Sequence, residues 1–181
     1  ITKKGGSKPI QGTLVSTYDG SNDSFTPFGA LYGTYKGFSY RVSGDYTDAS
    51  DKRGGSGTII NSSYLQRNYS AYLDYAWNNG KAGFGYDHFW SNINIPSSSS
   101  VEASTSVTVN LGLPQWKRDR LYGFFEQEKI SDYLQKIKLT AFTQKTEKDF
   151  ANEIDVLVMM SPVMTMNANT ELFTRNEQHS Y

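Results

Sequence analysis

A period-two alternation of apolar and polar side chains constrains this chain more than any other feature of its sequence. The clearest case is the segment FSYRVSGDYT at residues 38–47. Its even-numbered positions carry Phe, Tyr, Val, Gly and Tyr, whereas its odd-numbered positions carry only Ser, Arg, Ser, Asp and Thr. Because successive side chains of a strand point to opposite faces, this segment predicts a β-strand with one apolar and one fully polar face.

The same alternation recurs at residues 68–77 and 82–90, which are joined by the sequence Asn-Asn-Gly-Lys. The Asn-Gly step there predicts a tight hairpin turn with positive φ. Further strands are predicted at the following segments: 10–18, 27–35, 119–128 and 134–145. Within 119–128 the pattern is blurred, because Phe124 and Phe125 fall on opposite faces.

Residues 153–175 are the least clear part of the sequence. Both faces of 154–160 are mostly apolar, and Pro162 follows. We expect a strand, a break near Ser161-Pro162 and another strand from about Val163, because proline rarely lies inside a strand. A buried helix turn is the alternative, since short apolar runs are ambiguous.

The predicted connections alternate strictly between short and long. Short links at 36–37, 78–81 and 129–133 alternate with longer polar ones at about 19–26, 48–66 and 92–117. This asymmetry is typical of outer-membrane barrels, which have short periplasmic turns and long extracellular loops. The sequence therefore predicts an all-β protein, an antiparallel transmembrane β-barrel. Residues 10–181 would hold its strands, with long extracellular loops at about 48–66 and 92–117.

The composition excludes several other classes of protein. Lys plus Arg equals Asp plus Glu, 18 each, so we expect no nucleic-acid partner. Hydrophobic residues make up 37% of the chain and aromatic residues 14%, which fits a large helix-packed core poorly. The chain has no Cys, so it holds no disulfide or thiolate metal site. No apolar run approaches the ~18 residues of a transmembrane helix.

Two groups of residues are assigned to the two faces of the predicted barrel wall. The aromatic residues predicted near strand ends on the apolar face, as a girdle at the level of lipid headgroups, are Tyr69, Tyr75, Trp77 and Trp90. The charged residues predicted to face a hydrated lumen are Arg41, Asp45, Asp74, Asp87, Lys136 and Lys138. The alternative for the aromatic group is the general preference of strands for aromatic residues.

No residue is assigned to catalysis, to a metal or to a ligand. The two histidines, His88 and His179, are interpreted as packing or interfacial residues. Gly5-Gly6 and the run Gly54 to Gly57 lack the Lys-Ser/Thr of a phosphate-binding loop. We therefore expect no enzymatic activity and no cofactor.

Three segments resemble TonB-dependent outer-membrane receptors. ITKKGGSKPIQGTLVSTYDG resembles the junction between the plug and the barrel of these receptors, and FSYRVSGDYTDASD resembles their third barrel strand and its loop. The segment from residue 113 to 150 resembles the haem, haemoglobin and siderophore receptors of the family. The residues that carry this third likeness are Pro114, Asp119, Arg120, Phe142 and Gln144.

The resemblance implies a 22-stranded barrel with an N-terminal plug in the outer membrane of a Gram-negative bacterium. Residues 1–9 would end the plug, and the rest would form the early part of the barrel. It implies active uptake of an iron chelate (siderophore) or haem, with the TonB complex and membrane lipid as partners. Two alternatives stay open, a passive outer-membrane porin and a soluble extracellular β-sandwich that binds sugar or protein.

Overall fold

The computed structural model describes residues 7–96, 99–102, 105–160 and 164–180. It describes side chains for residues 7–96, 109–154 and 172–180. The described chain is all-β and antiparallel, as predicted from the alternation. Within these ranges no helix is long and apolar enough to cross a membrane.

Most of the chain lies in long strands. Their bounds are β1 (Gln11–Asp19), β2 (Ser24–Tyr35), β3 (Phe38–Ala49), β4 (Lys52–Gly54), β5 (Gly57–Ile59), β6 (Tyr64–Trp77), β7 (Gly80–Ile95), β8 (Ser99–Glu102), β9 (Thr105–Glu128), β10 (Lys136–Met160) and β11 (Met164–Ser180). Every strand predicted from the sequence is present, and most are longer than predicted.

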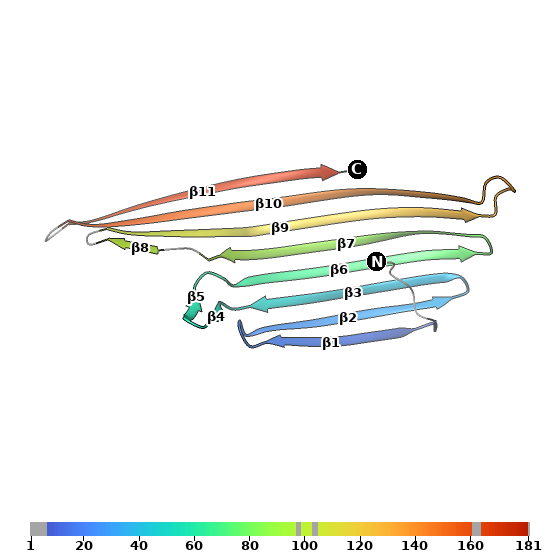
Figure 1. Cartoon of the computed structure of the whole chain (residues 1–181), viewed down its shortest axis with the longest axis horizontal. Coiled ribbons are helices and arrows are strands. Elements are labelled where there is room, and N and C mark those ends of the chain that lie inside the picture. Colours follow the sequence, from blue (N-terminus) through green and yellow to red (C-terminus); the bar gives the residue numbers. More distant parts are fainter. Residues whose placement is uncertain (1–6, 97–98, 103–104, 161–163, 181) are drawn as a thin grey trace.

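The strands form one antiparallel sheet in the order β1-β2-β3-β6-β7-β9-β10-β11 (Figure 1). β8 pairs with β9, and β4 and β5 form a separate small hairpin. Each strand of the main order pairs with its neighbour in sequence, apart from the short strands inserted in two connections. This meander leaves β1 and β11 as the two edges of the sheet, so the described strands do not close into a barrel.

The connections at one end of the sheet are two residue pairs, 36–37 and 78–79, and the longer segment 129–135. Lys36 and Gly37 make a two-residue turn with φ of 48° and 86°, which suits the twist of a hairpin. The predicted turn at 78–81 is shorter than expected, because β7 already begins at Gly80. Neither Asn79 nor Gly80 has a positive φ. The expectation of a positive φ at the Asn-Gly step was therefore wrong.

At the other end of the sheet, β1 and β2 are joined by residues 20–23 alone, so the long link predicted at about 19–26 was wrong, and the two longer connections also differ from the prediction. The segment 48–66 is not one open loop, because β3 extends to Ala49, the β4–β5 hairpin follows and β6 begins at Tyr64. The prediction of a loop at 92–117 was wrong over most of its length. β7 continues to Ile95 and β9 begins at Thr105, while β8 pairs back onto β9.

β10 runs without a break from Lys136 to Met160, so the strands predicted at 134–145 and from about residue 153 are one strand, and β11 begins at Met164. The helix alternative is therefore wrong for these strands. The break expected near Ser161-Pro162 lies outside the described residues. Of residues 1–9, expected at the end of a plug, the carbonyl of Lys8 accepts a hydrogen bond from the Thr34 amide at 3.0 Å.

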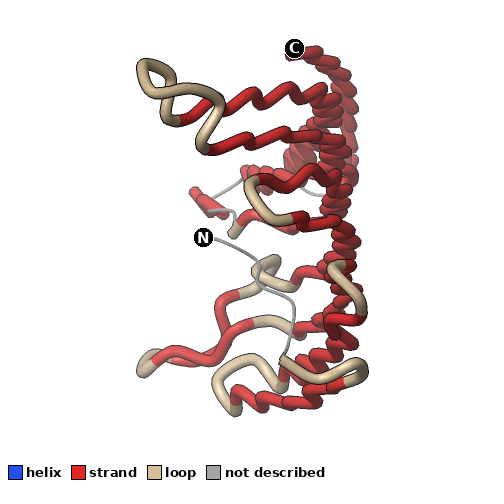
Figure 2. The backbone as a smooth tube through the Cα atoms, turned by 90° about the vertical axis from the view of Figure 1, so that its right-hand side faces the viewer, coloured by secondary structure: helices blue, strands red, loops and turns tan. Residues whose placement is uncertain are grey.

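The sheet is a single curved layer. Seen along the strands, no second layer lies against it (Figure 2). Among the described side chains the buried hydrophobic residues are only Ala30 and Ala49. A soluble sheet of this size covers one face with a second layer that forms an apolar core. The described chain has no such core.

Candidate functional site: the two faces of the sheet

The strand register sorts the side chains onto two opposed faces. Phe38 lies opposite Tyr75, which lies opposite Ala82, which in turn lies opposite Phe125. Rows of this kind cross the sheet at right angles to the strands. We call the side that carries them the apolar face. Its band consists of three successive rows across β3, β6, β7, β9 and β10: Phe38, Tyr75, Ala82, Phe125 and Leu139; Tyr40, Leu73, Phe84, Gly123 and Ala141; Val42, Ala71, Tyr86, Leu121 and Thr143.

The band is exposed rather than packed. Phe84 is 55% exposed, Val42 55% and Leu139 62%. Leu14 and Leu31 extend the apolar surface onto β1 and β2 and are exposed as well. Most of the large apolar side chains of this face are thus uncovered, whereas Pro9 reaches the face at Tyr40, whose hydroxyl donates a hydrogen bond of 3.0 Å to the Pro9 carbonyl.

Aromatic rings line the band beside the short turns. Phe38 and Tyr75 have ring centroids 4.6 Å apart, Tyr75 and Trp77 6.2 Å, and Trp77 and Phe125 5.9 Å. The indole nitrogen of Trp77 donates a hydrogen bond of 3.0 Å to Gln127. These rings therefore form a continuous row with a polar contact at its outer side. Tyr75 and Trp77 lie near the end of β6, as predicted.

The opposite margin of the band is marked by aromatic and charged groups together. Tyr69 and His88 stack with centroids 5.8 Å apart, and Nδ1 of His88 lies 2.6 Å from a carboxylate oxygen of Asp119. The guanidinium of Arg67 lies 4.9 Å from the ring of Trp90. Tyr69 and Trp90 do not lie at strand ends, because β6 and β7 extend to Tyr64 and Ile95. They lie instead where the apolar face becomes charged.

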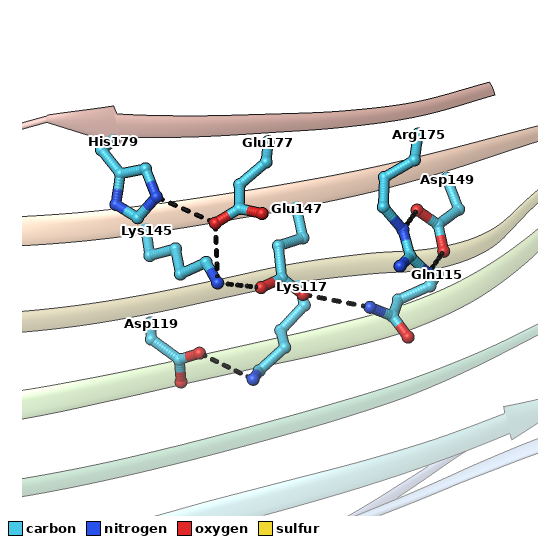
Figure 3. A network of polar contacts seen from close by, with 9 residues as sticks. All are labelled: Gln115, Lys117, Asp119, Lys145, Glu147, Asp149, Arg175, Glu177 and His179. Carbon is cyan, nitrogen blue, oxygen red and sulfur yellow. Dashed lines mark hydrogen bonds and ion pairs between the residues drawn. The ribbon is translucent and has the colours of Figure 1, made fainter.

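Beyond this margin the same face carries a network of charges on β9, β10 and β11 (Figure 3). The Lys145 ammonium contacts Glu147 at 2.5 Å and Glu177 at 2.7 Å, and Lys117 contacts Asp119 at 3.1 Å. His179 lies 2.9 Å from Glu177. His179 is therefore part of this surface network, and His88 packs at the margin of the band.

One ion pair of this region is much less exposed on its acidic side. The Asp149 carboxylate is 3% exposed and accepts two hydrogen bonds from the Arg175 guanidinium, at 2.8 and 2.9 Å. These hydrogen bonds hold the pKa of Asp149 below its ordinary value, against the opposing effect of desolvation. The pair clamps β10 to β11 outside the apolar band.

The opposite side, which we call the polar face, carries hydrogen-bonding groups over the whole width of the sheet. Ser43 and Ser70 are bonded at 2.7 Å, and the amide of Asn68 donates to Asp45 at 2.6 Å. The register places on this face all six residues predicted to line a lumen: Arg41, Asp45, Asp74, Asp87, Lys136 and Lys138. The prediction that these six residues share one face is thus confirmed. That this face lines a lumen stays a prediction.

Cations on the polar face lie over aromatic rings. Arg120 lies 5.4 Å from the ring of Tyr122, and Lys148 lies 4.6 Å from that of Trp116. Arg118 lies 5.9 Å from the ring of Phe89. A shallow hollow of about 360 Å³ lies among the side chains of β7, β9, β10 and β11. The sequence did not predict this grouping, because its members come together only through the register of four strands.

The residues that carry the family resemblance fall on both faces. Asp119 lies on the apolar face, whereas Arg120, Phe142 and Gln144 lie on the polar face. Pro114 lies in β9 where the pairing with both neighbouring strands shifts its register. Such an irregularity tolerates a residue that has no amide hydrogen to donate.

The described residues hold no group of three or more His, Cys, Asp or Glu side chains arranged to bind a metal ion. Comparison of the chain with protein-family models, with curated proteins and with solved structures finds no match.

Proposed function

We propose that this sheet is part of the wall of a transmembrane β-barrel in the outer membrane of a Gram-negative bacterium. Its apolar face would meet lipid, and its polar face would meet water in the lumen. The observation that carries the proposal is the exposed apolar band, bounded on both sides by aromatic rings and on one side by charges. Membrane barrels have an apolar band between two aromatic girdles and a polar interior.

Water is a poor solvent for the apolar face. Soluble monomers rarely expose a contiguous apolar patch larger than a few hundred Å². Here the band crosses at least five strands, and the buried hydrophobic residues of the described part are two alanines. Lipid chains would cover the band without a second protein layer.

The height of the band matches a bilayer. On β6 the band and the aromatic rings that flank it extend from Trp77 to Tyr69, which are eight residue steps apart along the strand. At a rise of about 3.4 Å per residue this is roughly 27 Å along the strand. A strand tilt of about 40° reduces it to roughly 20 Å of height, near the ~25 Å of outer-membrane barrels.

The open edges require more strands than these. In hydrocarbon every backbone donor and acceptor needs a partner, so the edges of β1 and β11 must be paired by other strands. Eight neighbouring strands that curve without meeting belong to a barrel of more than eight strands. A large barrel of this kind agrees with the 22 strands that the family resemblance implies.

Within that class we propose an energised receptor that takes up an iron chelate or haem with the help of the TonB complex. The support is the resemblance of residues 1–20, 38–51 and 113–150 to TonB-dependent receptors. In this mechanism the external loops capture the ligand, a plug occludes the lumen, and a pull by TonB opens a path. No covalent bond is made or broken.

Cysteine scanning of β3 tests the membrane assignment. The chain has no Cys, so each introduced thiol is unique within these residues. Spin labels are placed singly at positions 38 to 46 of the protein in lipid vesicles. Their collisions with oxygen, which dissolves in lipid, are then compared with collisions with a water-soluble nickel complex. We expect oxygen to dominate at 38, 40 and 42 and nickel to dominate at 39, 41, 43 and 45.

Nickel access at every position would refute the lipid-facing assignment and would favour the soluble β-sandwich. Extraction gives an independent check, since a barrel needs detergent and migrates differently in gels after heating. Iron-chelate or haem uptake that survives collapse of the inner-membrane energy supply would refute the energised receptor and favour the porin.

A further inference from the structure

We propose that the polar face holds a binding site for an organic anion that combines a carboxylate with a flat ring. The site is the hollow on β7, β9, β10 and β11, and we call it the ring-anion site. The residues that form it are Phe89, Trp116, Arg118, Gln144, Lys148 and Gln178. This inference goes beyond the proposed function and does not depend on transport, because it requires only that the polar face is wet.

The register builds the site from neighbouring rows. Phe89 lies opposite Arg118, which lies opposite Thr146, which lies opposite Gln178. Trp116 and its partner Lys148 lie one row further along the strands. The backbone hydrogen bonds of four paired strands therefore fix the spacing of these side chains before any ligand binds.

The charged side chains that line the site are all positive. Arg118 and Lys148 are cationic and exposed, Gln144 and Gln178 offer amide groups, and no carboxylate lines the hollow. The carboxylates of β10 and β11 at this level, Glu147, Asp149 and Glu177, lie on the opposite face. On β7, Asp87 shares the polar face and lines a neighbouring hollow with Arg118. An anion would therefore meet two positive charges without repulsion from the three acids of β10 and β11.

The rings determine what else the ligand should carry. Phe89 and Trp116 pack edge to face with centroids 5.3 Å apart, and Trp116 is half-buried. They provide an apolar wall beside the two cations, against which a flat ring can pack. The guanidinium of Arg118 can bind a carboxylate through two parallel hydrogen bonds. A volume of about 360 Å³ accommodates a small ring compound rather than a bare inorganic ion.

Binding of 1-naphthoate to the protein in detergent tests the proposal by calorimetric titration. Arg118→Gln should weaken binding at least about tenfold, since the charge-assisted hydrogen bonds of the guanidinium to the carboxylate are lost. Two matched controls each remove one positive charge elsewhere. Lys117→Gln acts on the apolar face one residue away, and Lys138→Gln acts on the polar face near the opposite end of β10. Both controls should change the affinity for 1-naphthoate by no more than about twofold relative to wild type.

The neutral analogue 1-naphthamide and the ringless anion acetate separate the two parts of the ligand. Each should bind at least about tenfold more weakly than naphthoate, and Trp116→Leu should reduce naphthoate binding while leaving acetate binding unchanged. The site would be overturned if naphthoate does not bind, if naphthamide or acetate binds as tightly, or if Lys117→Gln weakens binding as much as Arg118→Gln. Heat-modifiable migration checks that each variant is folded. Failure of binding with the lipid alternation of β3 intact would reject the ring-anion site alone.

Discussion

Replacement of Ala141 by arginine is the most direct test of which solvent the apolar face meets. Ala141 lies on this face in the middle row of the band, opposite Gly123. Because Gly123 has no side chain and Ala141 is exposed, an arginine fits there without a steric clash. The substitution therefore reports almost entirely on the solvent beside the sheet.

The expected cost follows from the position of Ala141 along β10. It lies four residues from Ile137, at the turn side of the band, and four from Lys145, where the face becomes charged. Each of these separations is about 13 Å along the strand, which corresponds to about 10 Å in membrane depth at a strand tilt of ~40°. Arginine near the midplane of a barrel wall costs about 2–4 kcal/mol, whereas an exposed substitution in water stays within ~0.5 kcal/mol.

The assay is the free energy of unfolding in denaturant for the protein in phospholipid vesicles. Thr143→Arg, one row closer to Lys145, should cost only about 0–1 kcal/mol because arginine there reaches the interface. Thr140→Arg is the matched control on the polar face and should be nearly neutral. Equal, small effects at Ala141 and Thr140 would refute the argument that lipid covers this face.

Two further predictions concern the packing of the sheet. Gly83→Ala should destabilise the protein by about 1–3 kcal/mol in the same assay, because its Cβ would lie 2.6 Å from the Leu73 carbonyl oxygen. Gly123→Ala, whose Cβ meets nothing closer than 3.7 Å, should be near neutral, and equal costs would contradict this account. Arg175→Gln should destabilise the protein only slightly, because the Arg175 side chain is 63% exposed and its ion pair is screened by solvent. The lowered pKa of Asp149 means that the pair stabilises the fold above the ordinary value of 3.8 and loses this contribution as pH falls through the lower pKa. Wild type should therefore lose more stability than Arg175→Gln between pH 6 and pH 3, and parallel pH curves would contradict the assignment.

The strands and their two faces were predictable because the alternation is local. Segments 38–47 and 82–90 each show which residues share a face, and the pairing of β3, β6 and β7 keeps that assignment across the sheet. Even the blurred segment 119–128 becomes clear from the register, which places Phe125 with the apolar rows and Phe124 with Tyr72 on the polar face.

The prediction of a loop at 92–117 was wrong because its strand signal was overlooked. Val107, Val109 and Leu111 alternate with Ser, Thr and Asn, which is the same period-two pattern. The serine-rich segment before them and Pro114 after them favoured a loop. The strand tolerates Pro114 through a local shift in register, and a single sequence gives no sign of such a shift.

The ring-anion site was beyond sequence reasoning for a different reason. Phe89, Arg118 and Gln178 meet only if three strand pairs have the right register, and an error of one residue in any pair would move one of them to the other face. Alternation assigns a residue to a face, but it does not determine which residues on neighbouring strands lie at the same level.

The level at which charge begins on the apolar face carries information on the tilt of the strands. On β10 the first charged residue of this face is Lys145, and its row runs through Asp119, His88 and Tyr69 to Gly44 on β3. On β3, however, charge begins only at Asp48. The boundary thus moves by four residues over the four strand steps from β10 to β3, or about one residue per strand.

A membrane surface is flat, so the charge boundary should lie at one height on every strand. It can move by one residue per strand, as here, only if the strands are tilted from the membrane normal. One residue is about 3.4 Å along a strand and neighbouring strands are about 4.8 Å apart, which gives a tilt of about 35°. This lies within the ~35–45° of membrane barrels. Polarised infrared spectroscopy of the protein in oriented bilayers should therefore give a mean strand tilt near 35–45°. Strands parallel to the membrane normal would show that the charge boundary does not follow a lipid surface.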